Sequence, residues 1–229
     1  MMFLSRITMK PGRGSIIRYV SAGGGIYNEH RKIWNFFPDD KKASRDFLYR
    51  KIDAGALPQY YILSKRAPVN EQEIWKIETK VFDPVIKNGD YLRFSLRVNP
   101  VVTKKTGDVE SKKRKRDDVY MEALARYEGV PKTDRPTNNE ILVEAGLKWI
   151  TERVSDYGFS VQNNDVIVEG YHRFEGMKDK KNHRIQLGVI DYSGILKVTD
   201  SEVFMEKALK RGIGKAKAFG CGLLLIKRL

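Results

Sequence analysis

The C-terminal stretch from residue 211 to residue 228 constrains this chain most. Two lysines, Lys215 and Lys217, are bracketed by Gly212, Gly214, Gly220 and Gly222, and an apolar run at residues 223–226 follows directly. Glycine permits positive φ and lets the backbone approach a ligand closely. The stretch is therefore either a glycine-rich turn into a final buried strand, or a loop whose N–H groups and ammonium charges bind phosphates. The spacing alone leaves both interpretations open.

The charge balance indicates the class of partner. The 229 residues include 43 Lys and Arg against 29 Asp and Glu, a formal net charge of +14. So large an excess favours a polyanion, which is RNA, DNA or an anionic membrane. No apolar run approaches the ~20 residues of a membrane-spanning helix, and the N-terminus lacks the layout of a signal peptide, so a cytoplasmic protein is expected. Cys221 is the single cysteine, which excludes an internal disulfide and a cysteine-based zinc site.

The first hundred residues follow an order of alternating strands and helices. The pattern predicts a strand at 1–10, a loop at 11–25, a helix at 26–37, strands at 47–50 and 59–64, a short helix at 69–75 and a strand at 90–98. This βαββ(α)β order is typical of a ferredoxin-like or RNA-recognition domain, assigned to residues 1–103.

The composition changes after residue 103. Residues 104–116 hold a run of Lys and Arg with few apolar residues, and residues 131–139 are rich in Pro, Thr and Asn, with a helical pattern at 119–127 between them. Residues 104–139 are therefore assigned to a basic linker or insert. The basic run is either a mobile solvated loop or an arm that binds nucleic acid.

The remaining residues, 140–229, repeat the first plan without repeating its sequence. They predict a helix at 140–157, a strand at 159–161, a hairpin formed by 166–174 and 184–190, a strand at 195–198, a helix at 201–211 and the final strand. The expected fold is therefore α+β, with two tandem ferredoxin-like (RRM-like) βαββαβ domains joined by a basic linker.

Tyr27 and His30 form the candidate catalytic pair. They lie three residues apart on the expected helix, so the phenol and the imidazole share one face. Such a pair suits RNA cleavage, in which one group helps to deprotonate a ribose 2′-OH and the other protonates the departing 5′-oxygen. No metal is needed, because the nucleophile belongs to the substrate. The alternative is that both rings simply pack on the core, since one Tyr-x-x-His pair is a weak signal.

The hairpin near residues 166–190 carries the second group of candidates. Its basic residues are Arg173, Lys178, Lys180, Lys181 and Arg184. Basic and aromatic residues interleaved on a hairpin suit an RNA groove or loop. The alternative is a solvated hairpin with ordinary surface charges, and the large global charge excess favours binding.

Four segments together resemble CasE, the family of CRISPR-associated endoribonucleases that cleave the repeats of type I-E systems. They occur in the family's order and are Met2-Phe-Leu-Ser-Arg-Ile, Tyr27-Asn-Glu-His-Arg-Lys-Ile-Trp-Asn-Phe-Phe-Pro38, Leu92-Arg-Phe-Ser-Leu-Arg-Val-Asn-Pro100 and the glycine-rich stretch Arg211 to Leu224. The resemblance spans nearly the whole chain.

The resemblance implies both a fold and an activity. It implies two ferredoxin-like domains and cofactor-free, metal-independent cleavage at the 3′ side of a CRISPR repeat hairpin, leaving a 5′-hydroxyl and a 2′,3′-cyclic phosphate or 3′-phosphate. It also implies that the protein stays on the RNA as a subunit of a type I-E surveillance complex, with no membrane partner. His30 and Tyr27 match the family's catalytic histidine and tyrosine, and Arg173 lies near its hairpin arginines. Lys215 and Lys217, with Gly212, Gly214 and Gly220, would contact phosphates near the domain junction.

The chain departs from the family pattern at two places. Some relatives carry a lysine and a serine shortly after the histidine, where Asn35 and Pro38 stand here, and Lys32 is the candidate auxiliary cation instead. Residues 112–139 are also longer and more basic than expected for the family. The alternative function is a non-catalytic scaffold that binds guide RNA with the same double fold, and a basic ribosomal protein is a third class.

Overall fold

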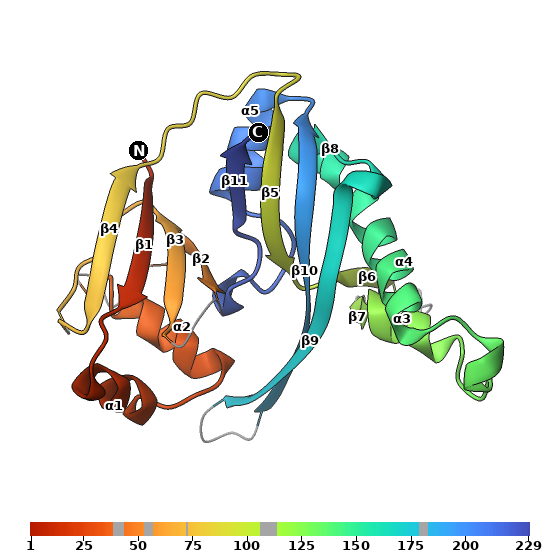
Figure 1. The fold of residues 1–229 in the computed structure, drawn as a ribbon, viewed down its shortest axis with the longest axis horizontal. Coiled ribbons are helices and arrows are strands. Elements are labelled where there is room, and N and C mark those ends of the chain that lie inside the picture. The colour runs from red at the N-terminus through yellow and green to blue at the C-terminus, as the bar shows by residue number, and fades with distance from the viewer. Residues whose placement is uncertain (39–43, 53–56, 72, 106–113, 179–182) are drawn as a thin grey trace.

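Two large antiparallel β-sheets lie side by side, with helices at their flanks (Figure 1). This is a computed structural model, and it describes residues 1–38, 44–52, 57–71, 73–105, 114–178 and 183–229. Within these ranges no helix is long and apolar enough to cross a membrane. The architecture is a mixed α/β fold, as the sequence predicts at this coarser level.

The first sheet contains four strands in the order β2-β3-β1-β4, all antiparallel. They are β1 (Phe3–Met9), β2 (Phe47–Ile52), β3 (Gln59–Ser64) and β4 (Trp75–Val81). Two helices, α1 (Arg13–Ser21) and α2 (Ile26–Trp34), follow β1. Ile33 of α2 packs with Ile7, Tyr60 and Ile62 of the sheet, and all four side chains are buried. This shared core fixes α2 against the sheet.

Two expectations for this first part were wrong. The segment at 11–25 was expected to be a loop, but it contains α1, which has no buried residue. Without a buried face there is no apolar periodicity for a sequence pattern to reveal. The short helix expected at 69–75 is not there in the described residues. Trp75 instead begins β4, in which Trp75 is buried while Lys76 is exposed, as period-two alternation requires.

The second sheet has the order β11-β5-β10-β8, and β9 also pairs with β10. Its strands are β5 (Tyr91–Val98), β8 (Phe159–Ser160), β9 (Val166–Lys178), β10 (His183–Val198) and β11 (Leu224–Arg228). One face packs on α4 (Asn138–Thr151) and η4 (Phe204–Lys210). The short helix α5 (Ser201–Val203) precedes η4, which continues it with wider, π-type turns. Trp149, Tyr192 and Phe204 are among the buried side chains of this core.

The pairing of β5 corrects the expected organisation. Residues 90–98 do form a strand, but it pairs with β10 and β11 in the second sheet and not with the first. The chain therefore passes from one sheet to the other between Val81 and Tyr91, in the yellow segment of Figure 1, earlier than the boundary expected near residue 103. The strands expected at 184–190 and 195–198 are also one continuous strand, β10.

The segment assigned to a basic linker has structure on both sides of residues 106–113, which lie outside the described part. Strands β6 (Val101–Lys105) and β7 (Arg114–Asp118) pair as a hairpin, and α3 (Val119–Ala125) follows at the expected place. A short turn, η1 (Lys132–Asp134), leads to α4, which begins with a capping box between Thr137 and Glu140. Further single turns are η2 (Val154–Tyr157), η3 (Asn163–Asp165) and η5 (Lys217–Phe219).

A buried ion cluster joins the two sheets. Asp191 of β10 accepts hydrogen bonds from Arg50 of β2 at 3.2 Å and from Arg97 of β5 at 2.8 Å. Arg50 also donates to the Ser95 hydroxyl at 2.7 Å. Next to this cluster, Leu48 and Leu63 of the first sheet pack on Leu223. The contacts hold β2, and with it α2, beside the C-terminal glycine stretch.

Candidate functional site

His30 lies half-buried on α2 at the junction of the two sheets. Its ring centre is 6.2 Å from that of Trp34, 6.3 Å from that of Phe47 on β2 and 6.3 Å from that of Phe219 in η5. The indole N–H of Trp34 donates to Nε2 of His30 at 3.0 Å, which assigns the proton of the neutral imidazole to Nδ1. Nδ1 is buried, and in the part of the chain that the structure describes no hydrogen bond to it is formed. Three segments distant in sequence therefore surround one titratable group.

The surroundings of His30 favour its neutral form. Burial lowers its pKa below the usual value, and the charge of the Arg45 guanidinium lowers the pKa further, whereas the Ala218 backbone opposes the change. A neutral imidazole near physiological pH can accept a proton, which is what a general base must do. The site therefore suits proton abstraction.

Tyr27 lies half-buried one turn before His30 on the same helix, so the spacing puts both side chains on one face. The other candidate on this helix, Lys32, has different neighbours. Its buried ammonium lies 3.5 Å from a Glu29 carboxylate oxygen and 3.7 Å from the centre of the Tyr19 ring. Glu29 in turn accepts hydrogen bonds from the hydroxyls of Tyr19 and Tyr60. Lys32 thus belongs to a cluster that fastens α1 and α2 to the sheet.

The glycine stretch is a compact loop whose glycines have positive φ. Gly212 has φ 76° and Gly222 has φ 88°, and a Cβ on Gly222 would lie 2.6 Å from the Ile213 carbonyl oxygen. Much of the loop's backbone is used internally, because the N–H of Ile213 donates to Gly222 O at 2.9 Å and that of Gly222 to Arg97 O at 2.7 Å. In this part the glycines serve a tight turn into β11.

The middle of the loop faces the first sheet and carries the lysines. The Tyr49 hydroxyl donates to the Ala218 carbonyl at 3.2 Å, which ties η5 to β2. Lys215 is exposed and Lys217 is half-buried. The pKa of Lys217 is lowered by burial and by the positive charges of Arg45, Lys215 and Arg211. The loop therefore brings several cations to the junction where His30 lies.

Arg45 is a site residue that sequence reasoning missed. It lies two residues before β2, and its charge acts on both His30 and Lys217. It is half-buried, and no described residue forms a hydrogen bond with its Nη1 atom. A single arginine in a segment without periodicity gives no signal in the sequence, because its place depends on how α2, β2 and η5 meet.

The basic hairpin extends from the second sheet towards the end of the molecule where α2 lies (Figure 1). Arg173 is exposed on β9, where it donates to Gln186 of β10 at 2.9 Å. Lys178 and Arg184 lie on the two paired strands, β9 and β10. Lys180 and Lys181 lie outside the described residues. The structure thus brings the hairpin and the glycine loop to the same side as α2.

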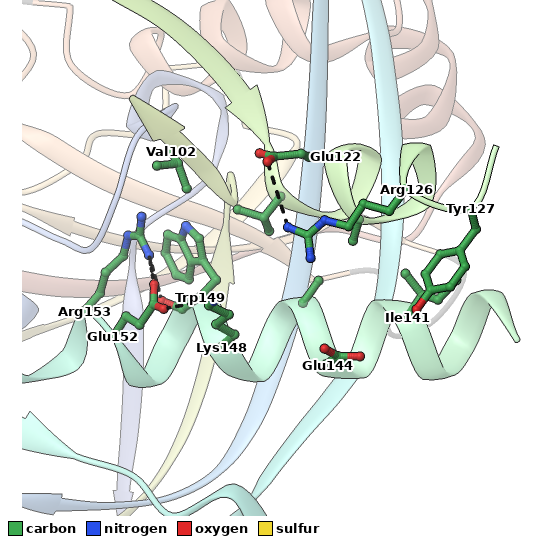
Figure 2. A pocket seen from close by; sticks show the side chains of 13 residues that line it. Val102, Glu122, Arg126, Tyr127, Ile141, Glu144, Lys148, Trp149, Glu152 and Arg153 are labelled. Carbon is green, nitrogen blue, oxygen red and sulfur yellow. Dashed lines mark hydrogen bonds and ion pairs between the residues drawn. The ribbon is translucent and has the colours of Figure 1, made fainter. Parts of the chain in front are cut away.

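A separate groove lies between α3 and α4, with a volume of about 220 Å³ (Figure 2). Its walls carry Glu122, Glu144 and Glu152 together with Arg126, Lys148 and Arg153. Within it Arg126 pairs with Glu122 and Arg153 with Glu152, each at 3.9 Å. Because its acidic and basic groups balance, this groove offers no net charge to a polyanion, unlike the junction around His30. Within the described ranges no three His, Cys, Asp or Glu side chains gather as metal ligands would.

Comparisons with known proteins agree on one family. The family model described as "CRISPR associated protein" matches residues 2–228. Among curated proteins, the chain is 26% identical over 206 residues to the CRISPR system Cascade subunit CasE of Escherichia coli K12, covering 89% of this chain and 92% of that protein.

Solved structures share the fold. The structure of Thermus thermophilus Cse3 bound to an RNA representing a pre-cleavage complex matches with a TM-score of 0.67 and 23% identity, covering 99% of this chain and 98% of that one. Cas6e of Escherichia coli K-12 matches with a TM-score of 0.58 and 20% identity, covering 99% and 100% of the two chains. A chain of a CRISPR RNA-guided surveillance complex matches with a TM-score of 0.62 and 16% identity, covering 99% and 100%.

Proposed function

The chain belongs to the family of CRISPR-associated proteins, and from this we propose that it is an endoribonuclease that cuts the repeat hairpins of precursor CRISPR RNA. The curated relative is named CasE, a subunit of Cascade, and a solved neighbour is named a CRISPR endoribonuclease bound to RNA. In this proposal the protein acts in the cytoplasm, stays on the cut hairpin and joins the surveillance complex.

The strand orders support the finer assignment of two ferredoxin-like units. In the first unit, β1, α2, β2, β3 and β4 follow one another, and the sheet order is β4-β1-β3-β2. The second unit has the chain order β5, α4, β9, β10, η4 and β11. Its sheet order, β11-β5-β10-β9, is the same arrangement. Both strand orders fit the split βαβ connectivity of a ferredoxin-like fold, although the described residues of the first unit form no helix between β3 and β4. On this assignment residues 101–137 are an insertion within the second unit.

The observation that carries the proposed activity is the environment of His30. Its imidazole is held neutral at a junction that gathers cations, so a bound phosphodiester and a proton acceptor would meet there. We propose that His30 takes the proton of the ribose 2′-OH as the 2′-oxygen bonds to phosphorus. The bond from phosphorus to the 5′-oxygen breaks, and that oxygen takes a proton, which we assign to Tyr27. The products are a 2′,3′-cyclic phosphate and a 5′-hydroxyl.

No metal takes part in this step, because the substrate supplies the nucleophile and protein cations neutralise the phosphate. Positioning the 2′-OH in line with the bond that breaks supplies much of the rate. Lys32 remains a candidate auxiliary cation, although Glu29 and Tyr19 are its present partners. A structural role for Lys32 is better supported by these contacts.

The RNA stem would be bound by two groups of cations. We assign one to the hairpin, with Arg173, Lys178, Lys180, Lys181 and Arg184. The other is the glycine loop, where Lys215 and Lys217 lie beside Gly212, Gly214 and Gly220. Arg173 and Lys215 are exposed, so the phosphates of the stem can reach both side chains. Such contacts fix the position of the RNA, and cleavage needs His30 in addition.

The test is incubation of the purified protein with a labelled repeat hairpin in EDTA, followed by end-group analysis. We expect one cut that leaves a 5′-hydroxyl and a cyclic phosphate, and no cut when the nucleotide before it is 2′-deoxy. His30→Ala should abolish cleavage and keep hairpin binding. Arg31→Ala, an exposed change on the same helix, should still cleave. Tight binding by the wild-type protein without cleavage would instead indicate a guide-RNA scaffold, and loss of cleavage in EDTA a metal nuclease.

A further inference from the structure

Arg45 is a half-buried cation without a partner in the described part of the chain. Its Nη1 atom is buried and makes no hydrogen bond, and none of the described carboxylates pairs with it. Buried guanidinium groups are normally paired, because an unsatisfied charged donor loses its hydration without compensation. An arginine kept in this state points to a ligand that supplies the missing acceptor.

Three segments meet at Arg45. Its charge acts on His30 of α2, on Tyr49 of β2 and on Lys217 of η5. These segments are tied together, since the Tyr49 hydroxyl bonds to Ala218 O and the ring of His30 lies against Phe219. Arg45 therefore sits inside the junction and not on an independent surface.

Among the described residues no carboxylate forms an ion pair with Arg45, whereas basic side chains add positive charge to the junction. Lys217 is half-buried beside it, and Lys215 and Arg211 also raise the local positive potential. Like charges held together away from water destabilise one another, and an anion bound among them removes that repulsion. A bound phosphate would balance this positive charge.

We propose that Arg45 and Lys217 bind the phosphodiester at which the RNA is cut, with Arg45 contacting a non-bridging oxygen beside His30. The proposal rests on the proposed function and adds the group that holds the reacting phosphate. When the 2′-oxygen attacks, negative charge builds on the non-bridging oxygens. A guanidinium with free N–H groups offers two parallel donors to them, which a lysine cannot do.

This role differs from that of the exposed hairpin cations. Those bind many phosphates of the stem and contribute mainly to affinity. Arg45 meets one phosphate, and its contact strengthens as charge develops, so its loss lowers the rate more than the affinity. Measuring both quantities in the same variants separates the two roles.

The first experiment compares Arg45→Gln, Arg45→Lys and the control Arg93→Gln. Arg93 is exposed on β5, so its change removes the same charge away from the junction. We expect Arg45→Gln to lower the single-turnover rate constant by about a hundredfold, while the Kd for a non-cleavable 2′-deoxy hairpin changes much less. Arg45→Lys should recover part of the rate, and Arg93→Gln should match the wild type. Equal losses of rate and affinity in Arg45→Gln would overturn the proposal.

A second readout tests the contact itself. Sulfur replacing one non-bridging oxygen of the cut phosphate weakens a hydrogen bond to that oxygen. Wild-type protein should therefore discriminate between the two phosphorothioate isomers, and Arg45→Gln should discriminate less. Unchanged discrimination in the variant would assign Arg45 a structural role only.

A third readout does not depend on cleavage. Inorganic phosphate should raise the thermal unfolding midpoint of the wild type and of Arg93→Gln, and raise that of Arg45→Gln less, since binding to the folded state stabilises it. If the wild type binds the hairpin without cutting it, the proposed function fails, and this phosphate result still decides whether Arg45 forms an anion site. Equal stabilisation of all three proteins would reject the site.

Discussion

Trp34 donates its indole N–H to Nε2 of His30 across one turn of α2, at 3.0 Å. The bond is made to the lone pair that a neutral imidazole would use to accept a proton. It therefore stabilises the neutral form and sets the tautomer, with the proton on Nδ1. For Nε2 to take a proton from the 2′-OH, the RNA must replace Trp34 as its partner. Trp34 thus prepares the protonation state of His30 in the free protein.

Trp34→Phe should raise the pKa of His30. Burial and Arg45 already hold this pKa below about 6.5, and the lost hydrogen bond had favoured the neutral form. The hydrogen bond to Nε2 is worth about 1 kcal/mol, and its loss makes protonation of the imidazole easier. Since neutral His30 is the base, the acid limb of the single-turnover pH–rate profile should move to higher pH, and cleavage near pH 6 should slow.

The measurement is NMR titration of the imidazole protons alongside the rate profile. The chain has 3 histidines, so His30→Gln identifies the relevant signal by its disappearance. A profile that keeps its acid limb while the imidazole pKa rises would show that His30 is not the group whose protonation limits the rate.

Gly222→Ala should destabilise the protein and displace the loop. The added Cβ would lie 2.6 Å from Ile213 O and 3.2 Å from Cγ of Lys217, at a φ of 88°. The matched change is Gly129→Ala, at φ 80° with no atom within 4 Å of the added Cβ. Gly129→Ala should lower the free energy of unfolding by about 1–2 kcal/mol, because only the left-handed backbone is unfavourable there. In urea unfolding, Gly222→Ala should lower the free energy of unfolding clearly more than Gly129→Ala does. Equal decreases would mean that the loop shifts to accommodate the methyl group.

Periodicity predicts the elements better than it predicts their partners. The alternation at residues 91–98 correctly indicates a strand, since Leu92, Phe94 and Leu96 are buried. It does not indicate that β5 pairs with β10 and β11, which lie much further along the chain, at residues 183–198 and 224–228. Pairing is decided by which edges meet in three dimensions, and that information is not local. The alternation therefore does not predict the sheet to which β5 belongs.

In the candidate site too, the local sequence predicts the helix but not the residues that surround it. The amphipathic pattern of residues 26–37 predicts the helix, and with it the shared face of Tyr27 and His30. Two aromatic neighbours of His30 come from other segments, Phe47 from β2 and Phe219 from η5, and no local sequence pattern predicts them. Arg45 enters the site only because these segments converge.

Lys215→Gln should weaken RNA binding without changing its specificity. Lys215 is exposed in the glycine loop, where it would neutralise one phosphate. Each such contact releases counterions, so the slope of log Kd against log salt should fall by about 1 in magnitude. The control is Lys87→Gln, exposed in the segment between β4 and β5. The assay is a salt titration of binding to the 2′-deoxy hairpin, and a slope equal to that of the control would place Lys215 outside the interface.

Asp191→Asn should destabilise the protein by weakening the contact between the two sheets. The carboxylate is 8% exposed and pairs with Arg50 and Arg97, whose side chains are 7% and 15% exposed. Removing one partner of a buried ion pair leaves uncompensated charge, which typically costs about 3–5 kcal/mol. Glu78→Gln is the control, because its pair with Arg6 is on the surface and should leave the unfolding midpoint unchanged. Since the cluster holds β2 beside the glycine loop, Asp191→Asn should also slow cleavage at temperatures where the protein is still folded. Full activity in such a destabilised variant would show that the junction around His30 forms without this ion cluster.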